Sequence, residues 1–317
     1  RAGLSFNPTD LSHVLYGGKE AFDRRQELSK LVQDDPIFSN ENKFNLNRDE
    51  EYERAFVINT RLVKRVVELG LNPADGMTFY NLVSELAPLS GLHHAMFIPT
   101  IASQGTPEQQ EKWLQPAMTY KLIGTYAQTE AGHGTFLRGI ETTATFDKAK
   151  DEFVLETPTL TSMKWWPGSL GKTATHCILM ARLIVDGNDL GLHPFIMQIR
   201  SLEDHTLLPG VEAGDIGRKM GWNNYDNGYL RLSGVRIPRD QMLMKYAKLD
   251  RNGVYTKPPH AKIAYGTMIY VRAGMVDDAY RGLSKAVTIA VRYSTVRRQG
   301  YGMGTAKKDE KTTAEWK

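Results

Sequence analysis

A short polar run that ends in a glycine-rich turn is the first feature whose residue types could do chemistry. The run from Thr125 to Thr129 alternates polar groups along a predicted strand, and Gly132-His133-Gly134 follows it. Glycines let backbone N–H groups approach an anion or the polar edge of a ring closely. By itself, the pattern is explained equally well by a strand followed by a β-turn.

An aromatic pair braced by proline and glycine is the second such feature. Trp165 and Trp166 precede Pro167 and Gly168 at the end of another predicted strand. An aromatic plane beside a bent backbone suits a flat redox ring. Spacing alone favours the simpler interpretation, in which two tryptophans pack inside a β core.

Two further patterns suggest sites that their context excludes. The Gly-Lys-Thr string at 171–173 ends like a phosphate-binding P-loop, but Trp166 stands where that motif needs a glycine. His93 and His94 are adjacent, so on a helix they point in different directions, and no carboxylate cluster accompanies them. We therefore expect neither a nucleotide triphosphatase nor a metal site.

The composition is that of an ordinary globular protein. The 317 residues suffice for two or more domains, and no run approaches the roughly 18–20 apolar residues that cross a bilayer. A net charge of +4 is too small to indicate nucleic acid as a partner. The single cysteine, Cys177, excludes an internal disulfide.

The elements that must position these residues begin with helices. Apolar residues recur at three- and four-residue steps from Glu50 to Gly70, and another helix is expected from about Lys19 to Asp34. A shorter helix opens at Thr106, whose hydroxyl can cap it while Gln109 completes the capping box.

Strand patterns replace helical ones from about Leu122, and a helix returns after Lys257-Pro258-Pro259. The long helix is expected from about Ile263 to Arg298. The fold class is therefore α+β and multi-domain, with a helical domain, a β-barrel-like domain and the start of a second helical domain. The strand candidates are Ile140 to Phe146, Asp151 to Thr157, His176 to Val185, Pro194 to Arg200 and Tyr229 to Ile237.

Six strings follow one another along the chain: GTYAQTEAGHGT, LRGIETTATFD, SMKWWPGSLGKT, DNGYL, RIPRDQMLMKYA and YGTMIYVR. In this order and spacing they resemble the peroxisomal acyl-CoA oxidases of the acyl-CoA dehydrogenase superfamily, and the resemblance extends to about Gln299. We expect the domains 1–121 (helical), 122–250 (β, contacting FAD by resemblance) and 251–299 (the first part of a second helical domain). The segment 300–317 is polar and rich in Gly, Lys and Thr, so we expect a disordered tail there.

The resemblance implies FAD as cofactor and assigns the first glycine-rich region to it. The strand from Tyr126 to Thr129 would lie beside the flavin ring. Thr129 and Gln128 would bind the pyrimidine edge of that ring through backbone or hydroxyl groups, which tunes its potential. Thr135 would contact the pyrophosphate and lie near the substrate.

The resemblance also implies roles for the tryptophan region and for a basic helix end. Trp166 would pack near the flavin and Gly168 would contact it through its backbone. Many dehydrogenases of the superfamily have Thr or Ser at the place of Gly168, so we expect the glycine to open space for dioxygen. Arg297, with Arg298 as a rival, would reach the FAD pyrophosphate of a neighbouring subunit, which implies a homodimer; a solvated basic helix end explains the pair equally well.

The implied reaction is the α,β-desaturation of a fatty acyl-CoA to a trans-2-enoyl-CoA, with molecular oxygen reduced to hydrogen peroxide, in the peroxisome. In these oxidases a glutamate far downstream removes the α-proton, and the chain would end before it. No catalytic residue is therefore nominated, since the base is expected beyond residue 317. Two alternatives stay open: a truncated, noncatalytic relative that binds flavin or acyl-CoA, and an acyl-CoA dehydrogenase that uses a protein electron acceptor.

Overall fold

The computed structural model describes residues 5–39, 41, 43–83, 88–260, 266–300 and 311–315. It separates two compact units, 1–264 and 265–317, which are described one at a time. The finer division of the chain at about residues 121 and 250 stays a prediction.

Helices form the first layer of the first unit. The two capping patterns explain where two of them begin: Asn47 and Glu50 form a capping box before α3, and Thr106 and Gln109 form the expected one before α6. The expected helices near 19–34, 50–70 and after Thr106 are confirmed. The helices are α1 (Pro8–Leu15), α2 (Lys19–Gln33), α3 (Arg48–Glu68), α4 (Pro73–Val83), α5 (Ile98–Gln104) and α6 (Pro107–Met118), with short turns η1 (Pro36–Phe38), η2 (Lys43–Asn45), η3 (Pro88–Ser90), η4 (His93–Phe97), η5 (Leu137–Gly139) and η6 (Arg239–Gln241).

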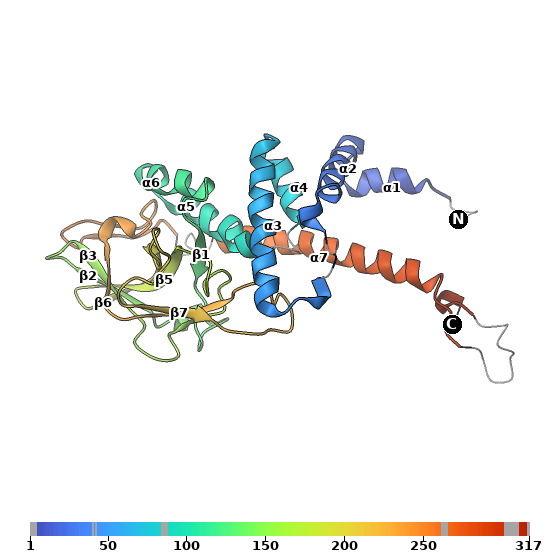
Figure 1. Cartoon of the computed structure of the whole chain (residues 1–317). Coiled ribbons are helices and arrows are strands. Elements are labelled where there is room, and N and C mark those ends of the chain that lie inside the picture. The colour runs from blue at the N-terminus through green and yellow to red at the C-terminus, as the bar shows by residue number, and fades with distance from the viewer. Residues whose placement is uncertain are drawn as a thin grey trace. The chain divides into compact units, whose positions relative to one another are not determined.

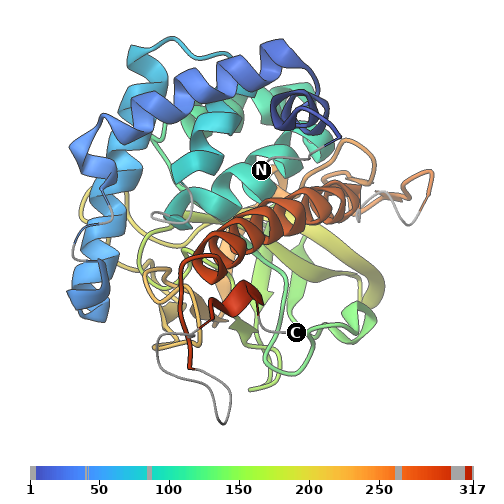
Figure 2. The ribbon, with the colours of Figure 1, turned by 90° about the vertical axis from the view of Figure 1, so that its right-hand side faces the viewer.

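A curled six-stranded sheet forms the second layer, and the blue-to-teal helices lie on one side of it (Figures 1 and 2). Its order is β1 (Gly124–Ala127), β5 (His176–Val185), β2 (Thr143–Asp147), β3 (Glu152–Glu156) and β9 (Val235–Pro238), and β6 (Asn188–Gln198) pairs with β5. A three-stranded sheet, β4 (Lys164–Trp165), β8 (Gly228–Leu232) and β7 (Val211–Asp215), and the pair β10 (Lys248–Leu249) and β11 (Tyr255–Thr256) complete the strands. The mixed α+β class is confirmed.

One strand prediction was wrong. The run expected from Tyr229 to Ile237 is two strands in different sheets, β8 and β9, separated by Gly234 at a φ of 63°. A non-glycine residue rarely adopts this left-handed conformation, so the glycine marks a turn that the apolar pattern concealed. By contrast, Asp186 and Gly187, at φ values of 50° and 78°, form the tight turn between β5 and β6 that an Asp-Gly step favours.

The second unit consists mainly of α7 (Gly266–Ser294), a 29-residue helix. The expected start at Ile263 lies outside the described residues, as do 301–310 and 316–317 of the tail predicted to be disordered. Within the described part of that tail, η9 (Thr313–Glu315) is held by a 2.7 Å hydrogen bond from the Thr313 N–H to the carbonyl of Arg297. No helix in the described ranges is long and apolar enough to cross a membrane.

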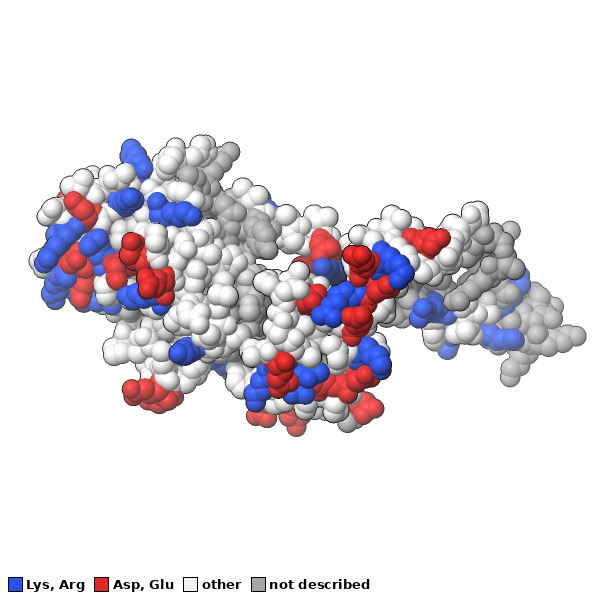
Figure 3. Space-filling model, turned by 90° about the horizontal axis from the view of Figure 1, so that it is seen from above, with Lys and Arg blue, Asp and Glu red and all other residues white. Residues whose placement is uncertain are grey.

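Charges of both signs are interspersed on the face shown in Figure 3. Among the described ion pairs, Arg236 pairs with Asp147 at 3.1 Å and with Glu152 at 3.0 Å across neighbouring strands. Such mixed pairs agree with the small net charge of the chain.

A buried histidine joins the helices to the first strand. His93 donates a hydrogen bond from Nε2 to the carbonyl of Ala117 (3.0 Å), and its Nδ1 accepts one from the N–H of Gly124 (2.9 Å). A Cβ on Gly124 would lie 2.1 Å from the ring of Phe97, so only glycine allows this contact. Burial lowers the pKa of His93 to about 4, and burial lowers the pKa values of His94 and His176 to about 4 as well.

Because of these buried histidines, we expect the free energy of unfolding to fall in acid. Because the folded chain excludes protons that the unfolded chain binds near its ordinary pKa of 6.5, stability should be complete above pH 6.5 and fall between pH 6.5 and 4. His93→Gln should make the slope of unfolding free energy against pH shallower by up to about 1.4 kcal/mol per pH unit over that window. Urea denaturation at half-unit pH steps measures this, and an unchanged slope would contradict it.

Candidate cofactor site

Two loops that are about 35 residues apart in the sequence lie side by side. The first loop (residues 128–135) follows β1, and the second loop (residues 163–169) contains β4. Glu130 and Lys164 form an antiparallel bridge between them, with hydrogen bonds from Trp165 N–H to the Thr129 carbonyl (2.9 Å) and from Ala131 N–H to the Met163 carbonyl (2.8 Å). The structure thus brings together the two motifs that the sequence singled out.

Thr129 offers unused hydrogen-bond donors at the end of an edge strand. β1 pairs with β5 alone among the named strands, and Thr129 follows it as a half-buried residue. Within the described parts of the chain, neither its N–H nor its hydroxyl donates a hydrogen bond. Beside it, Gln128 is half-buried and accepts a 3.4 Å hydrogen bond from the hydroxyl of the buried Tyr126. Such free donors can bind the polar edge of a ligand.

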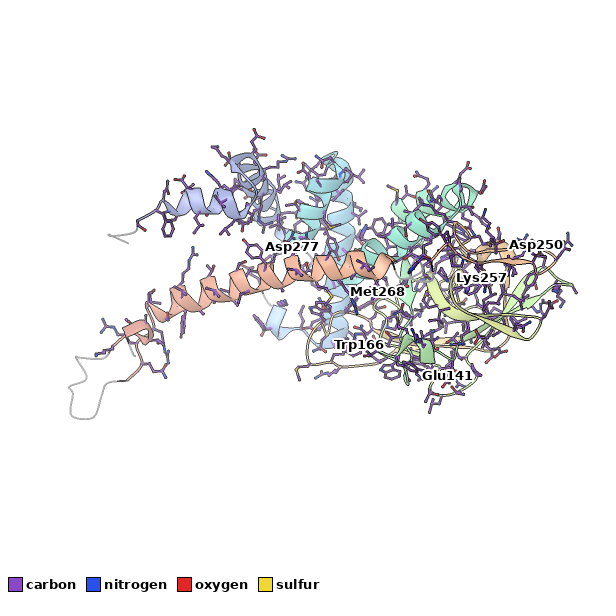
Figure 4. All side chains as sticks on the ribbon, turned by 180° about the vertical axis from the view of Figure 1, so that it is seen from behind. Glu141, Trp166, Asp250, Lys257, Met268 and Asp277 are labelled. Atoms are coloured by element: carbon purple, nitrogen blue, oxygen red, sulfur yellow. The ribbon has the colours of Figure 1, made fainter. Side chains whose placement is uncertain are left out.

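Trp166 has a fixed backbone and an exposed side chain. Its φ is 90°, a conformation that is unusual for a bulky residue and concentrates at functional sites. Its N–H bonds to the Gly228 carbonyl at 3.0 Å, and its carbonyl accepts a 2.6 Å bond from the Asn227 side chain. The indole is 55% exposed at the margin of the strands (Figure 4). A large flat apolar surface is thereby presented to solvent.

Gly168 leaves no open space in the direction that a side chain would take, so the expectation that the missing side chain opens space for dioxygen was wrong in that direction. A Cβ added to Gly168 would lie 2.1 Å from Cζ of Tyr225, whose buried ring fills that direction. The Gly168 carbonyl accepts a 2.6 Å hydrogen bond from the Thr125 hydroxyl, which joins the second loop to β1. Glycine is required here because a ring packs against the backbone.

Of the remaining predicted site residues, Thr135 makes no described hydrogen bond to the bridge between the two loops, and Arg297 belongs to the second unit. Thr135 is exposed, just after the glycine-rich turn. Of the two glycines in that turn, Gly132 is packed against Thr161, 2.8 Å from its would-be Cβ, whereas Gly134 meets nothing within 4 Å. Arg297 is exposed in the second unit, so its part in binding a pyrophosphate stays a prediction.

A buried ion pair holds the two loops together, and sequence reasoning missed it. Lys164 is fully buried and donates to Glu130 Oε1 (3.1 Å), to the Gln128 carbonyl (3.1 Å) and to the Met180 carbonyl (2.8 Å). Burial lowers the pKa of Lys164 to about 8, although Glu130 opposes this shift. The ammonium therefore persists at neutral pH, with one partner for each proton. The sequence offered one signal for this ion pair: an acidic residue, Glu130, in the first motif and a basic residue, Lys164, in the second.

Glu130 is surrounded by donors. Its carboxylate accepts hydrogen bonds from the N–H of Glu141 (2.9 Å), from the N–H and hydroxyl of Thr142 (2.9 and 2.5 Å) and pairs with His133 Nδ1 (2.9 Å). Burial by itself would raise the pKa of this carboxyl, but the charge of Lys164 and the bonds from Thr142 together hold it below its ordinary value. The carboxylate is therefore hydrogen-bonded at both oxygens and favoured in its ionised form.

Two further buried residues hold the chain that continues from the second loop. Arg200 donates to the carbonyls of Leu170 (3.1 Å), Gly171 (2.8 Å) and Ala174 (2.7 Å). Asp226 accepts from the N–H groups of residues 172 and 173, both at 2.7 Å. Together they hold residues 170–174, which include the Gly-Lys-Thr string, in hydrogen bonds within the protein.

The contact at Gly168 yields a stability test. Gly168→Ala should lower the free energy of unfolding by about 1–3 kcal/mol, because its Cβ overlaps the Tyr225 ring. In a Tyr225→Leu background the same change should cost at least about 0.5 kcal/mol less. Gly134→Ala, with nothing near its Cβ, is the matched control and should stay within about 0.5 kcal/mol. Denaturant titrations measure these free energies. If the costs of Gly168→Ala and Tyr225→Leu simply add in the double variant, the contact between Gly168 and the Tyr225 ring is ruled out.

Comparison with known proteins supplies the family. The acyl-coenzyme A oxidase N-terminal family matches residues 7–123, and the acyl-CoA oxidase C-alpha1 domain matches residues 265–315. The chain is 49% identical over 301 residues to peroxisomal acyl-coenzyme A oxidase 1 of Rattus norvegicus and 48% identical over 303 residues to that of Arabidopsis thaliana. These matches cover 94% of this chain but 46% of each relative, so the chain spans about half their length.

The solved structures similar to this chain are also acyl-CoA oxidases. An acyl-CoA oxidase from Lycopersicon esculentum (tomato) is 46% identical, with a TM-score of 0.93 over 99% of this chain and 48% of that one. Acyl-CoA oxidase-2 of Caenorhabditis elegans, solved with FAD, ascaroside-CoA and ATP, is 40% identical, with a TM-score of 0.90 over 98% of this chain and 47% of that one. The chain belongs to the acyl-CoA oxidase family.

Proposed function

We propose that this chain supplies the flavin-binding wall of a peroxisomal, FAD-dependent acyl-CoA oxidase. The whole enzyme would desaturate a fatty acyl-CoA to the trans-2-enoyl-CoA and reduce molecular oxygen to hydrogen peroxide. The observation that carries the proposal is the pair of unused donors on Thr129, in a loop that the Glu130–Lys164 bridge joins to the loop of the exposed Trp166.

The residues of the two loops fit a flavin. When bound, FAD would accept the electrons removed from the acyl chain and pass them to oxygen. The N–H and hydroxyl of Thr129 would hold the polar pyrimidine edge, and the half-buried Gln128 would border it. Trp166 offers an apolar plane for the ring, and the exposed hydroxyl of Thr135 would contact the pyrophosphate. Each of these groups is available without rearranging the buried contacts around it.

Two further parts of the proposal concern the location and the assembly of the enzyme. The curated relatives are peroxisomal by name, which supports the same location for this protein. We further propose a homodimer in which Arg297 reaches the pyrophosphate of the neighbouring subunit's FAD; its guanidinium is exposed and has no ion-pair partner among the described residues. The general base of the reaction is not assigned to any residue of this chain.

Flavin reduction and peroxide formation test the activity. The purified whole enzyme should be yellow, palmitoyl-CoA should bleach it under nitrogen, and hydrogen peroxide should form when air is admitted. Bleaching without peroxide would identify a dehydrogenase instead. A flavin site without bleaching would identify a noncatalytic relative, and failure to bind FAD at any concentration would overturn the proposal.

Thr129 tests the site itself. Thr129→Val keeps the N–H but removes the hydroxyl, so FAD should bind about three- to tenfold more weakly, the effect of one modest hydrogen bond. Thr145→Val makes the same change at an exposed position of β2 and should leave the dissociation constant unchanged. Quenching of flavin fluorescence measures both. Equal FAD affinities of the wild type and Thr129→Val would show that the Thr129 hydroxyl does not bind FAD.

A further inference from the structure

The buried cation Lys164 touches the same peptide unit that presents the free N–H of Thr129. A peptide unit joins the carbonyl of one residue to the N–H of the next, and here the Gln128 carbonyl accepts a 3.1 Å hydrogen bond from Lys164 Nζ. The other end of this unit is the Thr129 N–H, which donates no hydrogen bond within the described ranges. The cation and the free donor thus lie at opposite ends of one conjugated group.

A cation on the carbonyl makes the N–H of the same peptide a stronger donor. Electron density moves toward the oxygen, and hydrogen bonds in a chain strengthen one another in a low-dielectric interior. Lys164 is fully buried, so water does not screen this effect. The ammonium is shared between two kinds of acceptor, because it donates to Glu130 and also to the Gln128 carbonyl, each at 3.1 Å. Glu130 accepts further hydrogen bonds from Thr142 and from the N–H of Glu141, while the Gln128 carbonyl stays in direct contact with the ammonium.

We propose that Lys164 is a positioning residue that strengthens the Thr129 N–H through the Gln128–Thr129 peptide and thereby favours the reduced form of a ring bound at that N–H. Electron acceptance makes the pyrimidine edge of a flavin more electron-rich, so a stronger donor there stabilises the reduced ring more than the oxidised ring. The part that concerns the ring rests on the proposed function, whereas the polarised peptide does not.

The first experiment needs no flavin. Gln128–Thr129 is the only Gln–Thr step in the sequence, so carbonyl-¹³C glutamine combined with ¹⁵N threonine gives one NMR correlation, from this peptide. In the double variant Lys164→Met/Glu130→Gln, which removes the cation without leaving a buried anion unpaired, the carbonyl and amide signals should move upfield.

Thr142→Val is the matched control for that experiment. It disturbs the same buried cluster, because the Thr142 hydroxyl donates to Glu130, but it leaves Lys164 and its two carbonyl contacts in place. The signals of the Gln128–Thr129 peptide should move much less in this variant. Equal shifts of these signals in both variants, or no shift in the double variant, would contradict the claim that Lys164 polarises the Gln128–Thr129 peptide.

The second experiment measures the potential of bound flavin. In the double variant, the ratio of the affinity for reduced FAD to the affinity for oxidised FAD should fall about tenfold. This lowers the potential of the bound flavin by about 30 mV for a two-electron couple. Thr142→Val should keep the wild-type preference to within about twofold. Redox titration of the holoprotein against a reference dye gives the potentials.

The outcomes separate the two proposals. If the wild type binds no FAD, the proposed function fails and the NMR result still decides whether Lys164 polarises the peptide. If FAD binds and the potential of the double variant equals that of the wild type, the tuning role of Lys164 fails and the proposed function stands. If both variants lower the potential equally, Lys164 acts only by holding the structure, and the inference is wrong.

Discussion

The buried ion pair of Glu130 and Lys164 is the contact on which the candidate site depends. Thr129 immediately precedes the carboxylate, and Trp165 immediately follows the ammonium. Removing one partner of such a pair leaves a buried charge without compensation, which typically costs about 3–5 kcal/mol. Here every proton of the ammonium has an acceptor, and both carboxylate oxygens have donors. The pair is therefore better explained as a device that fixes the relative position of two loops than as a source of net stability.

Close backbone contacts give the second loop its shape. Trp166 keeps a left-handed backbone because Asn227 and Gly228 hold it from both ends. A Cβ on Gly228 would lie 2.4 Å from the N of Gly171, so the two segments pass each other at a distance that only glycine permits. The strain at Trp166 is offset by these contacts. The result is an indole that stays exposed although its backbone is fixed.

The helical layer supports the same loop from behind. The hydroxyl of Ser169 donates to the carbonyl of Leu89, and the Tyr225 hydroxyl accepts a 3.4 Å hydrogen bond from the N–H of Leu92. Burial raises the pKa of Tyr225 to about 12, so its ring remains neutral and acts as packing. His93 makes the corresponding connection at the start of β1. Helices, strands and loops are thus linked at the points where the candidate site is formed.

Local patterns in the sequence determined a large part of this protein. Apolar periodicity located α2, α3 and α7, a Thr-x-x-Gln box located the start of α6, and the ordered motifs indicated the family, because each of these signals is carried by neighbouring residues. The two loops were recognised separately for the same reason. The run that became β8 and β9 was misread because apolar alternation does not reveal a turn.

Only the tertiary structure decided what lies between the motifs. Glu130 meets Lys164, Lys164 contacts the carbonyl of Gln128, and the ring of Tyr225 fills the space beside Gly168. Each of these contacts joins residues more than 30 positions apart in the sequence. Sequence spacing carries no information on such distances. The glycine-rich region named at the outset is therefore a flavin-binding candidate by its resemblance to the family, whereas its free donor and the buried cation that contacts the same peptide are visible only in the tertiary structure.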